Sequence, residues 1–207
     1  MAVTTYAELQ SAIANFLARS DLTANIPDFI TLAEARMSRE LETRSQEKRA
    51  TASTTAGDEF ISLPTDLRKI RLVKTNTSPV EVLEYATPST YYDTYSATAG
   101  GNPEIYTVIG TELALRPIPS SVITIEIIYS QDIASLSDSN TSNTILARHP
   151  DAYLYGSLAQ AHIFLLDEAR ATQYDALFSR AMNEIRRDNE NAFFGGPVAM
   201  RSEYMSA

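Results

Sequence analysis

Apolar residues recur at helical spacing near the start of the chain. Thr5 and Glu8 fit a capping box, in which the threonine accepts from a helix amide and the glutamate reaches back to the cap. The apolar positions that follow predict a helix ending near Ser20. A second apolar face begins after Pro27, which suits the first turn of a helix, and charged residues fill the other positions. This spacing predicts a long second helix over residues 27–49.

The middle of the chain alternates with a period of two, which is typical of strands. The clearest strand is Ile123–Tyr129, with isoleucines on one face. Gly110 lies between two shorter alternating runs and suits a type II′ hairpin. Thr87 before Pro88 predicts a capped short helix that is rich in tyrosine. Residues 57–130 therefore predict a small, mostly antiparallel sheet.

Helical spacing returns after a linker rich in Ser, Asp and Asn. Pro150 begins a third long helix, and a fourth runs from about Ala169 to the polar residues 188–191. A lone amphipathic pair buries only one face of each helix, so the two pairs need each other. The predicted class is mainly α with a β insertion (α+β): a four-helix bundle interrupted by a small antiparallel sheet, with an extended C-terminal arm. The predicted boundaries are 1–56 for helices 1 and 2, 57–135 for the mostly β insertion, 136–192 for helices 3 and 4, and 193–207 for the arm.

Composition excludes several classes of function. The 207 residues carry a formal charge of −9, which argues against a general nucleic-acid binder, because such affinity comes from Lys and Arg on phosphates. The absence of cysteine excludes disulfides, cysteine-ligated metals and thiol nucleophiles. The N-terminus resembles no signal peptide, and the most apolar run, Val122–Tyr129, is too short for a membrane helix.

No group of residues in the sequence matches a known catalytic motif. The sequence has no nucleophile elbow, zinc-protease motif or phosphate loop. His149 is read as a capping or exposed residue, and His162 as a hydrogen-bonded histidine beside an apolar stripe. Adjacent acids, such as Asp58 with Glu59 and Asp167 with Glu168, are typical of solvated or capping positions. We expect no enzyme, no cofactor and no metal site.

Charge is distributed unevenly. Residues 36–74 carry a net charge of +3, which leaves −12 on the rest of the chain. One interpretation is a solvated helix face with internal ion pairs. Another is a basic edge that meets an acidic edge on a neighbouring copy, since charge asymmetry steers association. The candidate inter-subunit residues are Arg36, Arg39, Arg44, Lys48 and Arg49. A third interpretation is a nucleic-acid-associated protein that uses this segment with stacking tyrosines, namely Tyr91, Tyr92 and Tyr95.

The C-terminal stretch after the fourth helix has no helical or strand period but is rich in large apolar residues, which disordered tails usually lack. It is expected either to fold back on its own bundle or to become ordered in grooves of another protein. The candidate contact residues of this arm, with another protein or a neighbouring copy, are Phe193, Phe194, Gly195, Gly196, Pro197, Val198, Met200 and Tyr204.

Several short motifs, in this order, carry a resemblance to a known family: Tyr6–Leu9, Ile26–Glu34, Ile61–Asp66, Gly101–Tyr106, Leu113–Pro119 and Pro150–Gly156. With them, the sequence resembles the head-to-tail adaptor (connector) proteins of tailed bacteriophages, similar to podovirus tail tubular protein A. The match covers most of residues 5–190. The stretch after Phe193 resembles the family only in its place and character.

The resemblance implies a structural virion protein in the neck or tail, synthesised in the host cytoplasm. It implies a dodecameric ring between the portal protein and the tail nozzle, through whose channel DNA passes without specific binding. It further implies that helical bundles build the ring wall, that C-terminal arms grip the portal and that the sheet faces tail components. No membrane partner is expected.

Overall fold

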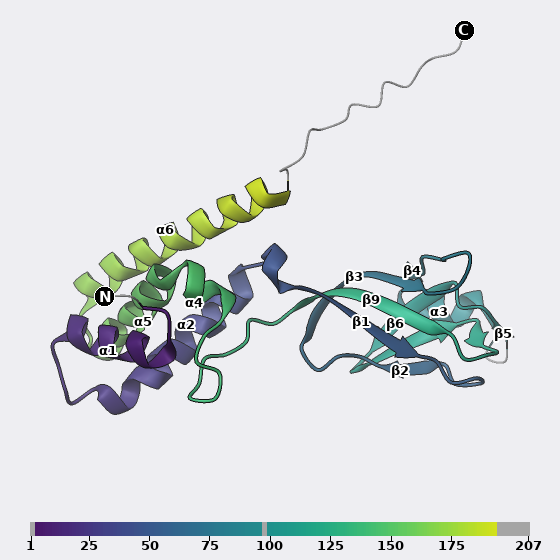
Figure 1. Ribbon diagram of the computed structural model, residues 1–207, viewed down its shortest axis with the longest axis horizontal. Coiled ribbons are helices and arrows are strands. Elements are labelled where there is room, and N and C mark those ends of the chain that lie inside the picture. The colour runs from purple at the N-terminus through teal and green to yellow at the C-terminus, as the bar shows by residue number, and fades with distance from the viewer. Residues whose placement is uncertain (1–2, 97–98, 194–207) are drawn as a thin grey trace, which may run out of the picture. The chain divides into compact units, whose positions relative to one another are not determined.

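The computed structural model describes residues 3–96 and 99–193, except for the side chain of Phe193. The chain folds into two compact units (Figure 1). The helical unit comprises residues 1–45 and 133–207, and the sheet unit comprises residues 46–132. The described residues form six α-helices and three small sheets, so the predicted α+β class is confirmed.

Five α-helices build the helical unit: α1 (Tyr6–Leu17), α2 (Ile26–Glu40), α4 (Thr144–Arg148), α5 (Pro150–Phe164) and α6 (Glu168–Phe193). The predicted capping box is present at α1. The Thr5 hydroxyl accepts from the Glu8 amide at 3.3 Å, and the Glu8 carboxylate accepts from the Thr5 amide at 3.0 Å. Helix α1 ends at Ala18 in the left-handed conformation. The last helical residue, Leu17, comes three residues before the end that the sequence predicts, near Ser20.

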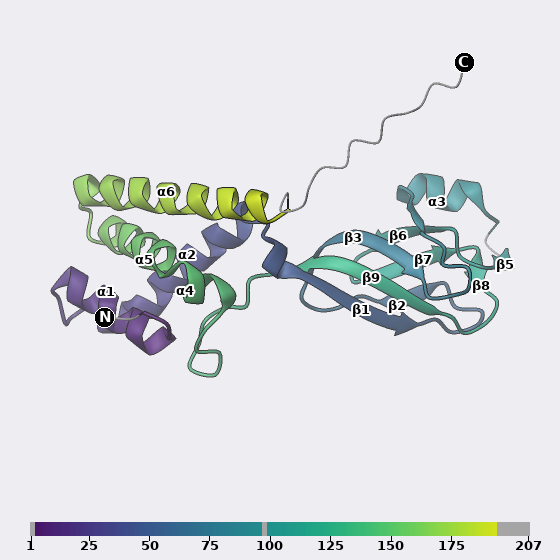
Figure 2. The same ribbon diagram turned by 45° about the horizontal axis from the view of Figure 1, so that its top comes forward.

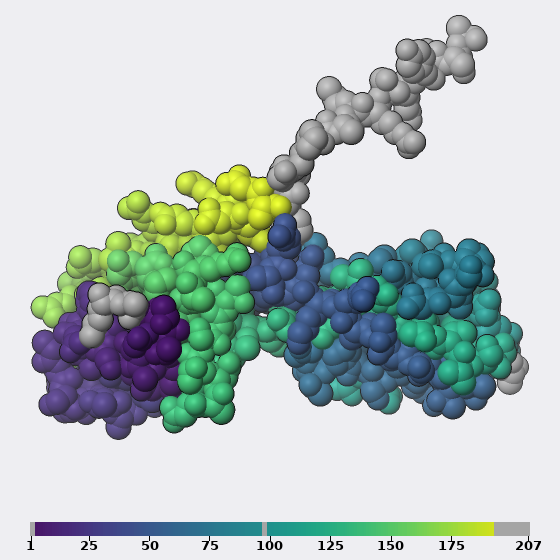
Figure 3. Space-filling view, in the orientation of Figure 1, coloured from purple at the N-terminus to yellow at the C-terminus, as the bar shows by residue number. Residues whose placement is uncertain are grey.

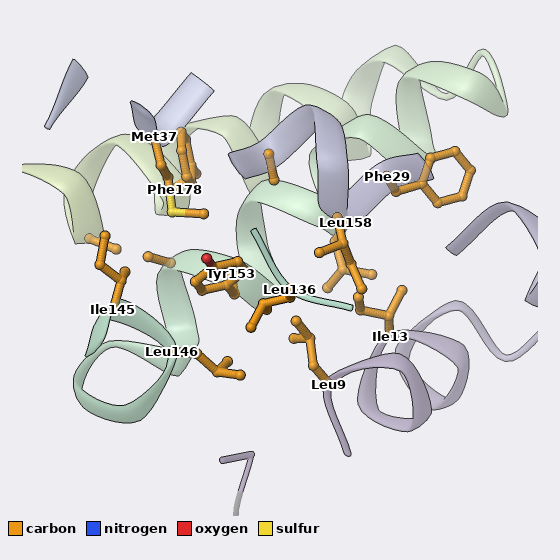
Figure 4. Close-up of a cluster of buried hydrophobic side chains, with 14 of the residues drawn as sticks. Leu9, Ile13, Phe29, Met37, Leu136, Ile145, Leu146, Tyr153, Leu158 and Phe178 are labelled. Carbon is orange, nitrogen blue, oxygen red and sulfur yellow. The ribbon is translucent and has the colours of Figure 1, made fainter. Parts of the chain in front are cut away.

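Helix α5 lies at the centre of the helical unit and contacts α1, α2, α4 and α6. Its Tyr153 and Leu158 are fully buried among side chains of the other helices, including Leu9 and Ile13 of α1 (Figure 4). Helix α6 instead lies at the surface of the unit along its length (Figure 3) and buries one face, which centres on Phe178. A helix that is apolar on most sides is buried in the core of its unit, and α5 is such a helix.

The sheet unit contains two sheets that face each other across a hydrophobic core (Figure 2). The three-stranded sheet has the order β1 (Glu47–Ser53), β9 (Thr124–Gln131) and β3 (Leu67–Thr75). The four-stranded sheet has the order β2 (Phe60–Ser62), β7 (Glu112–Arg116), β6 (Ile105–Ile109) and β4 (Glu84–Tyr85). A third pair joins β5 (Gly100–Gly101) to β8 (Ile118–Pro119). Helix α3 (Pro88–Thr94) packs on the outer side of the four-stranded sheet.

Alternation along each strand separates the core face from the outer face. Ile125, Ile127 and Tyr129 of β9 point into the core, where they meet Leu113 and Leu115 of β7. Their neighbours in sequence therefore lie on the outer faces. This assignment decides which charged residues are available to a partner.

Two predicted local features of the sheet unit are confirmed. Gly110 has φ +63° between β6 and β7, while Thr111 is not among the residues with positive φ, as a type II′ turn requires. Thr87 caps α3 by accepting from the Thr90 amide at 3.5 Å. Pro88 then occupies the first turn.

The predicted second helix, over residues 27–49, is wrong at its C-terminal end. Helix α2 ends at Glu40, Leu41 is extended, and β1 begins at Glu47. Strand β1 pairs with β9 over seven residues, from Glu47 opposite Ser130 to Ser53 opposite Thr124. A complete ladder with a distant strand outweighs the weak local preference for a charged helix.

The structure also differs from the prediction in the ends and pairing of the insertion. The sheet unit begins at Gln46 and ends at Asp132, whereas the sequence predicts 57 and 135. Two strand pairs, β4 with β6 and β5 with β8, are parallel. Helix α4 lies just beyond the predicted linker and before the predicted third helix.

Candidate assembly surface

The end of α2 is fastened to α6 by Arg36. Its guanidinium donates to Glu40 of the same helix at 3.1 Å and to Asp175 of α6. It also lies over the ring of Phe178, 4.6 Å from the centroid. Arg36 therefore joins ion pairing with a cation–π contact, and it holds two helices of the same unit together.

The last turns of α6 are fixed to the segment that follows α2. Arg186 donates to the Glu40 carboxylate at 3.0 Å. Asn189 donates to the Glu42 carbonyl at 2.9 Å and accepts from the Arg44 amide at 2.7 Å. The Arg44 guanidinium donates to the Ala192 carbonyl at 3.2 Å, one of the carbonyls that a helix end leaves without an internal partner. The root of the C-terminal arm is thereby held against the helical unit.

The five candidate inter-subunit residues lie in two units. Arg36 and Arg39 belong to α2 and Arg44 to the turn after it, and two of these contact α6 of their own chain. Lys48 and Arg49 lie on β1 in the sheet unit. The Lys48 ammonium donates to Asp66 at 2.7 Å, whereas the side chain of Arg49 is 71% exposed. Their role between subunits stays a prediction.

The candidate arm begins where the described residues end. Phe193 is the last residue of α6, and residues 194–207 lie outside the described part of the chain. The contacts predicted for Phe194, Gly195, Gly196, Pro197, Val198, Met200 and Tyr204 stay predictions.

A buried polar network that the sequence analysis missed ties the returning segment to the helices. Glu34 of α2 accepts from the Leu136 amide at 2.8 Å and from the Tyr153 hydroxyl at 3.1 Å. Asn143 donates to the same hydroxyl at 2.6 Å and to the Ala134 carbonyl at 2.8 Å. Burial raises the pKa of the Glu34 carboxyl, although both hydrogen bonds act in the opposite direction.

Replacing Glu34 by glutamine tests this network. A carboxyl whose pKa is higher in the folded protein stabilises the fold at low pH, and this contribution is lost as the pH rises through the folded-state pKa. Glutamine keeps an acceptor for Leu136 and Tyr153 but does not ionise. We therefore expect E34Q to match the natural chain below pH 4.5 and to be the more stable of the two at pH 7 in denaturant unfolding. A variant that is less stable at pH 7 than at pH 4, relative to the natural chain, would contradict this. The control Tyr153→Phe removes two hydrogen bonds, one to Glu34 and one from Asn143, and is expected to cost about 1–3 kcal/mol at either pH.

The sheet unit contains a buried cation at the end of β7. Arg116 is 3% exposed; it donates to the Glu59 carboxylate at 3.1 Å and to the Tyr95 carbonyl at 2.8 Å. Its guanidinium carbon lies 5.0 Å from the ring centroid of Tyr91 and 5.1 Å from that of Tyr92. Tyr91 is fully buried, and burial raises its pKa to about 12. Tyr91 is thus a structural group, which counts against its predicted role in stacking on nucleic acid.

One end of the helical unit exposes large apolar side chains around the connection between α5 and α6. Ile163 and Phe164 are each 56% exposed, and Leu166 is 88% exposed. Leu166 also has φ +57°, a conformation that costs free energy for a residue with a branched side chain. Phe164 packs against Phe29 of α2, with ring centroids 5.6 Å apart.

The titratable residues that the sequence analysis singled out have structural roles. His162 is buried and stacked on Tyr174, with centroids 5.2 Å apart, and burial lowers its pKa. Its Nδ1 has no hydrogen-bond partner among the described residues, so the predicted hydrogen bond is not made through that atom. Asp58 accepts from the Phe60 amide, and Asp167 accepts from the Arg170 amide in the first turn of α6. His149 is at the N-cap of α5 but makes no side-chain cap.

Neither a metal-binding group of three His, Asp or Glu residues nor a helix long and apolar enough to cross a membrane occurs within residues 3–96 and 99–193. The described residues instead form surfaces that could bind a partner. These are the anchored end of α6, the exposed apolar connection between α5 and α6, and the outer faces of the sheet unit.

Comparison with known proteins agrees with a role in assembly. No protein of curated function matches the chain. The family described as SU10 adaptor protein matches residues 4–201, which is nearly the whole chain. The chain therefore belongs to the SU10 adaptor protein family, a family of phage adaptor proteins that are structural components of the virion and not enzymes.

Proposed function

We propose that this chain is one subunit of a dodecameric ring that lies between the portal protein and the tail nozzle and extends the DNA channel. The observation that carries the proposal is the family match over residues 4–201. It is supported by the interrupted helical unit and by the separate sheet unit, which together give one subunit two surfaces for two sets of partners.

In this proposal α1, α2, α5 and α6 act as a four-helix bundle that builds the ring wall. The extensive packing of α5 on α6 and on α2 supports a rigid wall. Arg36, Arg39 and Arg44 lie beside or on the end of this bundle. They contribute to the neighbour contact through their charge, and Arg44 also holds the end of α6 in place.

The arm anchors the ring to the portal. Its aromatic and other apolar residues are of the kind that dominate interface energies, and the helix end from which it starts is fixed by Arg44 and Asn189. A short segment that becomes ordered in grooves of the portal gains affinity when its root is already held.

Deleting residues 194–207 tests the arm and keeps α6 whole. We expect a folded protein with unchanged far-UV circular dichroism that no longer binds portal rings. The measurement is to mix full-length and shortened chains with portal rings and to image the products, where the full chain should form a twelve-fold collar. A matched control removes only Ser206 and Ala207, which carry no large apolar side chain, and should bind like the full chain. Undiminished binding of the longer deletion would overturn the role of the arm.

The acidic surplus suits a channel that DNA must pass. A net charge of −9 repels phosphate, which lets a duplex slide without being held. The alternative, a nucleic-acid-associated protein using residues 36–74, requires affinity that falls steeply with salt. That segment is divided between the two units, and Tyr91 is buried, so neither feature supports the alternative. A steep salt dependence of duplex binding by the free chain would support it instead.

A further inference from the structure

The outer face of the three-stranded sheet is basic. Arg49 on β1 and Lys69 and Lys74 on β3 stand opposite outward-facing residues of β9, and Arg71 reaches across β9 to Glu47 at 3.1 Å. We call the outer residues of this sheet the basic face: Arg49, Lys69, Arg71, Lys74, Glu47, Glu126, Leu72 and Ile128. Four cations against two carboxylates leave it with a net charge of +2.

The basic face has the anatomy of an interface. Glu126 lies at its centre, only 4% exposed, and Lys74 and Arg49 lie 3.2 and 3.9 Å from its carboxylate. Leu72 and Ile128 form a directly paired, half-buried apolar patch beside it. The basic face thus combines paired charges with a half-buried apolar patch, and protein–protein contacts contain both apolar surface and polar groups.

The opposite side of the sheet unit is acidic. Residues 76–115 contain five carboxylates and neither lysine nor arginine. Glu84 of β4 and Glu112 of β7 point outward from the four-stranded sheet, because their neighbours Leu83 and Leu113 are in the core. Asp93 is exposed on α3, which covers this sheet.

No exposed cation compensates these acids among the described residues of this side. We call the outer residues of the four-stranded sheet and α3 the acidic face: Glu84, Asp93, Glu112, Ile109 and Tyr92. The nearest cation, Arg116, is buried and paired with Glu59. Ile109 and Tyr92 supply apolar surface, at 38% and 50% exposure.

We propose that the basic face of one copy packs against the acidic face of the next copy around the ring. The proposal rests on the proposed function, because it names the contact by which ring subunits meet. The two faces lie on opposite sides of one sandwich, so a subunit that has used one face still offers the other. Such a head-to-tail contact closes into a ring when its rotation divides the circle. Opposite net charges steer the copies together and exclude contact between like faces.

The three lysines of the chain allow a direct test. Lys48, Lys69 and Lys74 all lie in the three-stranded sheet. A carbodiimide joins an amine to a carboxylate only when the two are in contact, and the faces are separated by the thickness of two stacked sheets, about 10 Å at the backbone. A link from Lys69 to Glu84, Asp93 or Glu112 therefore joins two copies. Lys74 is bridged to Val82, two residues before Glu84, so a link from Lys74 to Glu84 shows contact between copies only when isotope labelling proves that it joins two of them.

The full chain, half of it labelled with ¹⁵N, is concentrated at low ionic strength, treated with carbodiimide and analysed by peptide mass spectrometry. We expect mixed-isotope links between those lysines and those acids, which disappear at high salt. Links within one copy, Lys48 to Asp66 and Lys74 to Glu126, should form in every sample and serve as the internal control. Links only to carboxylates outside residues 76–115, or none between copies, would overturn the proposal. Protection of the lysines by added duplex DNA, without links between copies, would assign the basic face to nucleic acid.

Charge reversal gives an independent measurement of the same contact. Arg49→Glu with Lys69→Glu makes both faces acidic, and Glu84→Lys with Glu112→Lys makes both faces basic. We expect each variant alone to associate at least about tenfold more weakly in sedimentation at low salt. An equimolar mixture of the two should recover association, because every contact then joins opposite charges. If the mixture associates no more strongly than the separate variants, the proposed pairing of the two faces is refuted.

The same treatment of neck complexes released from virions separates this inference from the proposed function. A ring of this chain without the expected links would refute the pairing of the two faces and leave the adaptor role standing. A neck that lacks this chain would refute the adaptor role itself.

Discussion

Replacement of Arg116 by methionine is expected to destabilise the sheet unit by about 3–5 kcal/mol. The guanidinium is almost fully buried, and its loss leaves Glu59 and the Tyr95 carbonyl without their partner. It also removes the cation that lies against the rings of Tyr91 and Tyr92, so α3 loses a contact with β7. The measurement is denaturant unfolding of the full chain followed by tyrosine signals.

Two further variants separate the ion pair from the packing. Arg116→Lys keeps the charge but loses the planar fork that reaches Glu59 and Tyr95 together, and we expect it to recover only part of the loss. Adding Glu59→Gln to Arg116→Met removes the unpaired carboxylate and should restore part of the stability. A loss below about 1 kcal/mol for Arg116→Met would show that water replaces the guanidinium and that the site is not closed.

Gly156→Ala should destabilise the helical unit by about 2 kcal/mol, although this change in a helix ordinarily stabilises by up to about 1 kcal/mol. A Cβ at this position would lie 2.9 Å from two ring carbons of Phe178 and 3.1 Å from the Ala33 Cβ. Phe178 is fully buried and held beneath Arg36, so the ring has no space into which to retreat. Overpacking therefore exceeds the gain in helix propensity.

The sign of the change makes this prediction easy to check by unfolding. Combining Gly156→Ala with Phe178→Leu should cost less than the sum of the two single changes, because the smaller side chain makes room for the methyl group. Gly100→Ala is the matched control: the nearest atom to its Cβ would be 3.9 Å away, and little change is expected. A stabilised Gly156→Ala variant would show that α5 and α6 separate readily.

Sequence reasoning was most successful where local signals determine structure. The capping box at Thr5, the prolines that open α3 and α5, and the glycine at the β6–β7 turn each act within four residues. The order of helices, sheet and helices followed from such signals. Helical spacing after Ala169 also predicted α6, whose buried face centres on Phe178.

Strand β1 could not be predicted in the same way. Its side chains are mostly exposed on both sides, so its alternation carries no hydrophobic signal. Its residues are stabilised by pairing with β9, some eighty positions later, rather than by their own sequence. The charged spacing of residues 36–49 was therefore interpreted as one long helix.

The candidate site shows the same limit. The basic segment was recognised from composition, but the partners of Arg36 and Arg44 lie on α6, more than a hundred residues away. Glu34 was hidden because a single acid on an apolar helix face has no pattern to distinguish it. The two oppositely charged faces could be assigned only from the strand register, which decides which residues of each strand face the core and which face outward.

The first and last strands of the sheet unit have a consequence for how such a protein can change over time. Glu47 pairs with Ser130, and the Gln46 side chain donates to the Gln131 carbonyl at 3.3 Å, so the chain enters and leaves this unit through adjacent residues. A unit whose two ends meet can be inserted, exchanged or removed as a cassette without opening a gap in its host. A short linker from Ser45 to Ile133 would then suffice to close the helical unit. Two lineages could accordingly share one scaffold of helices while carrying unrelated modules between them.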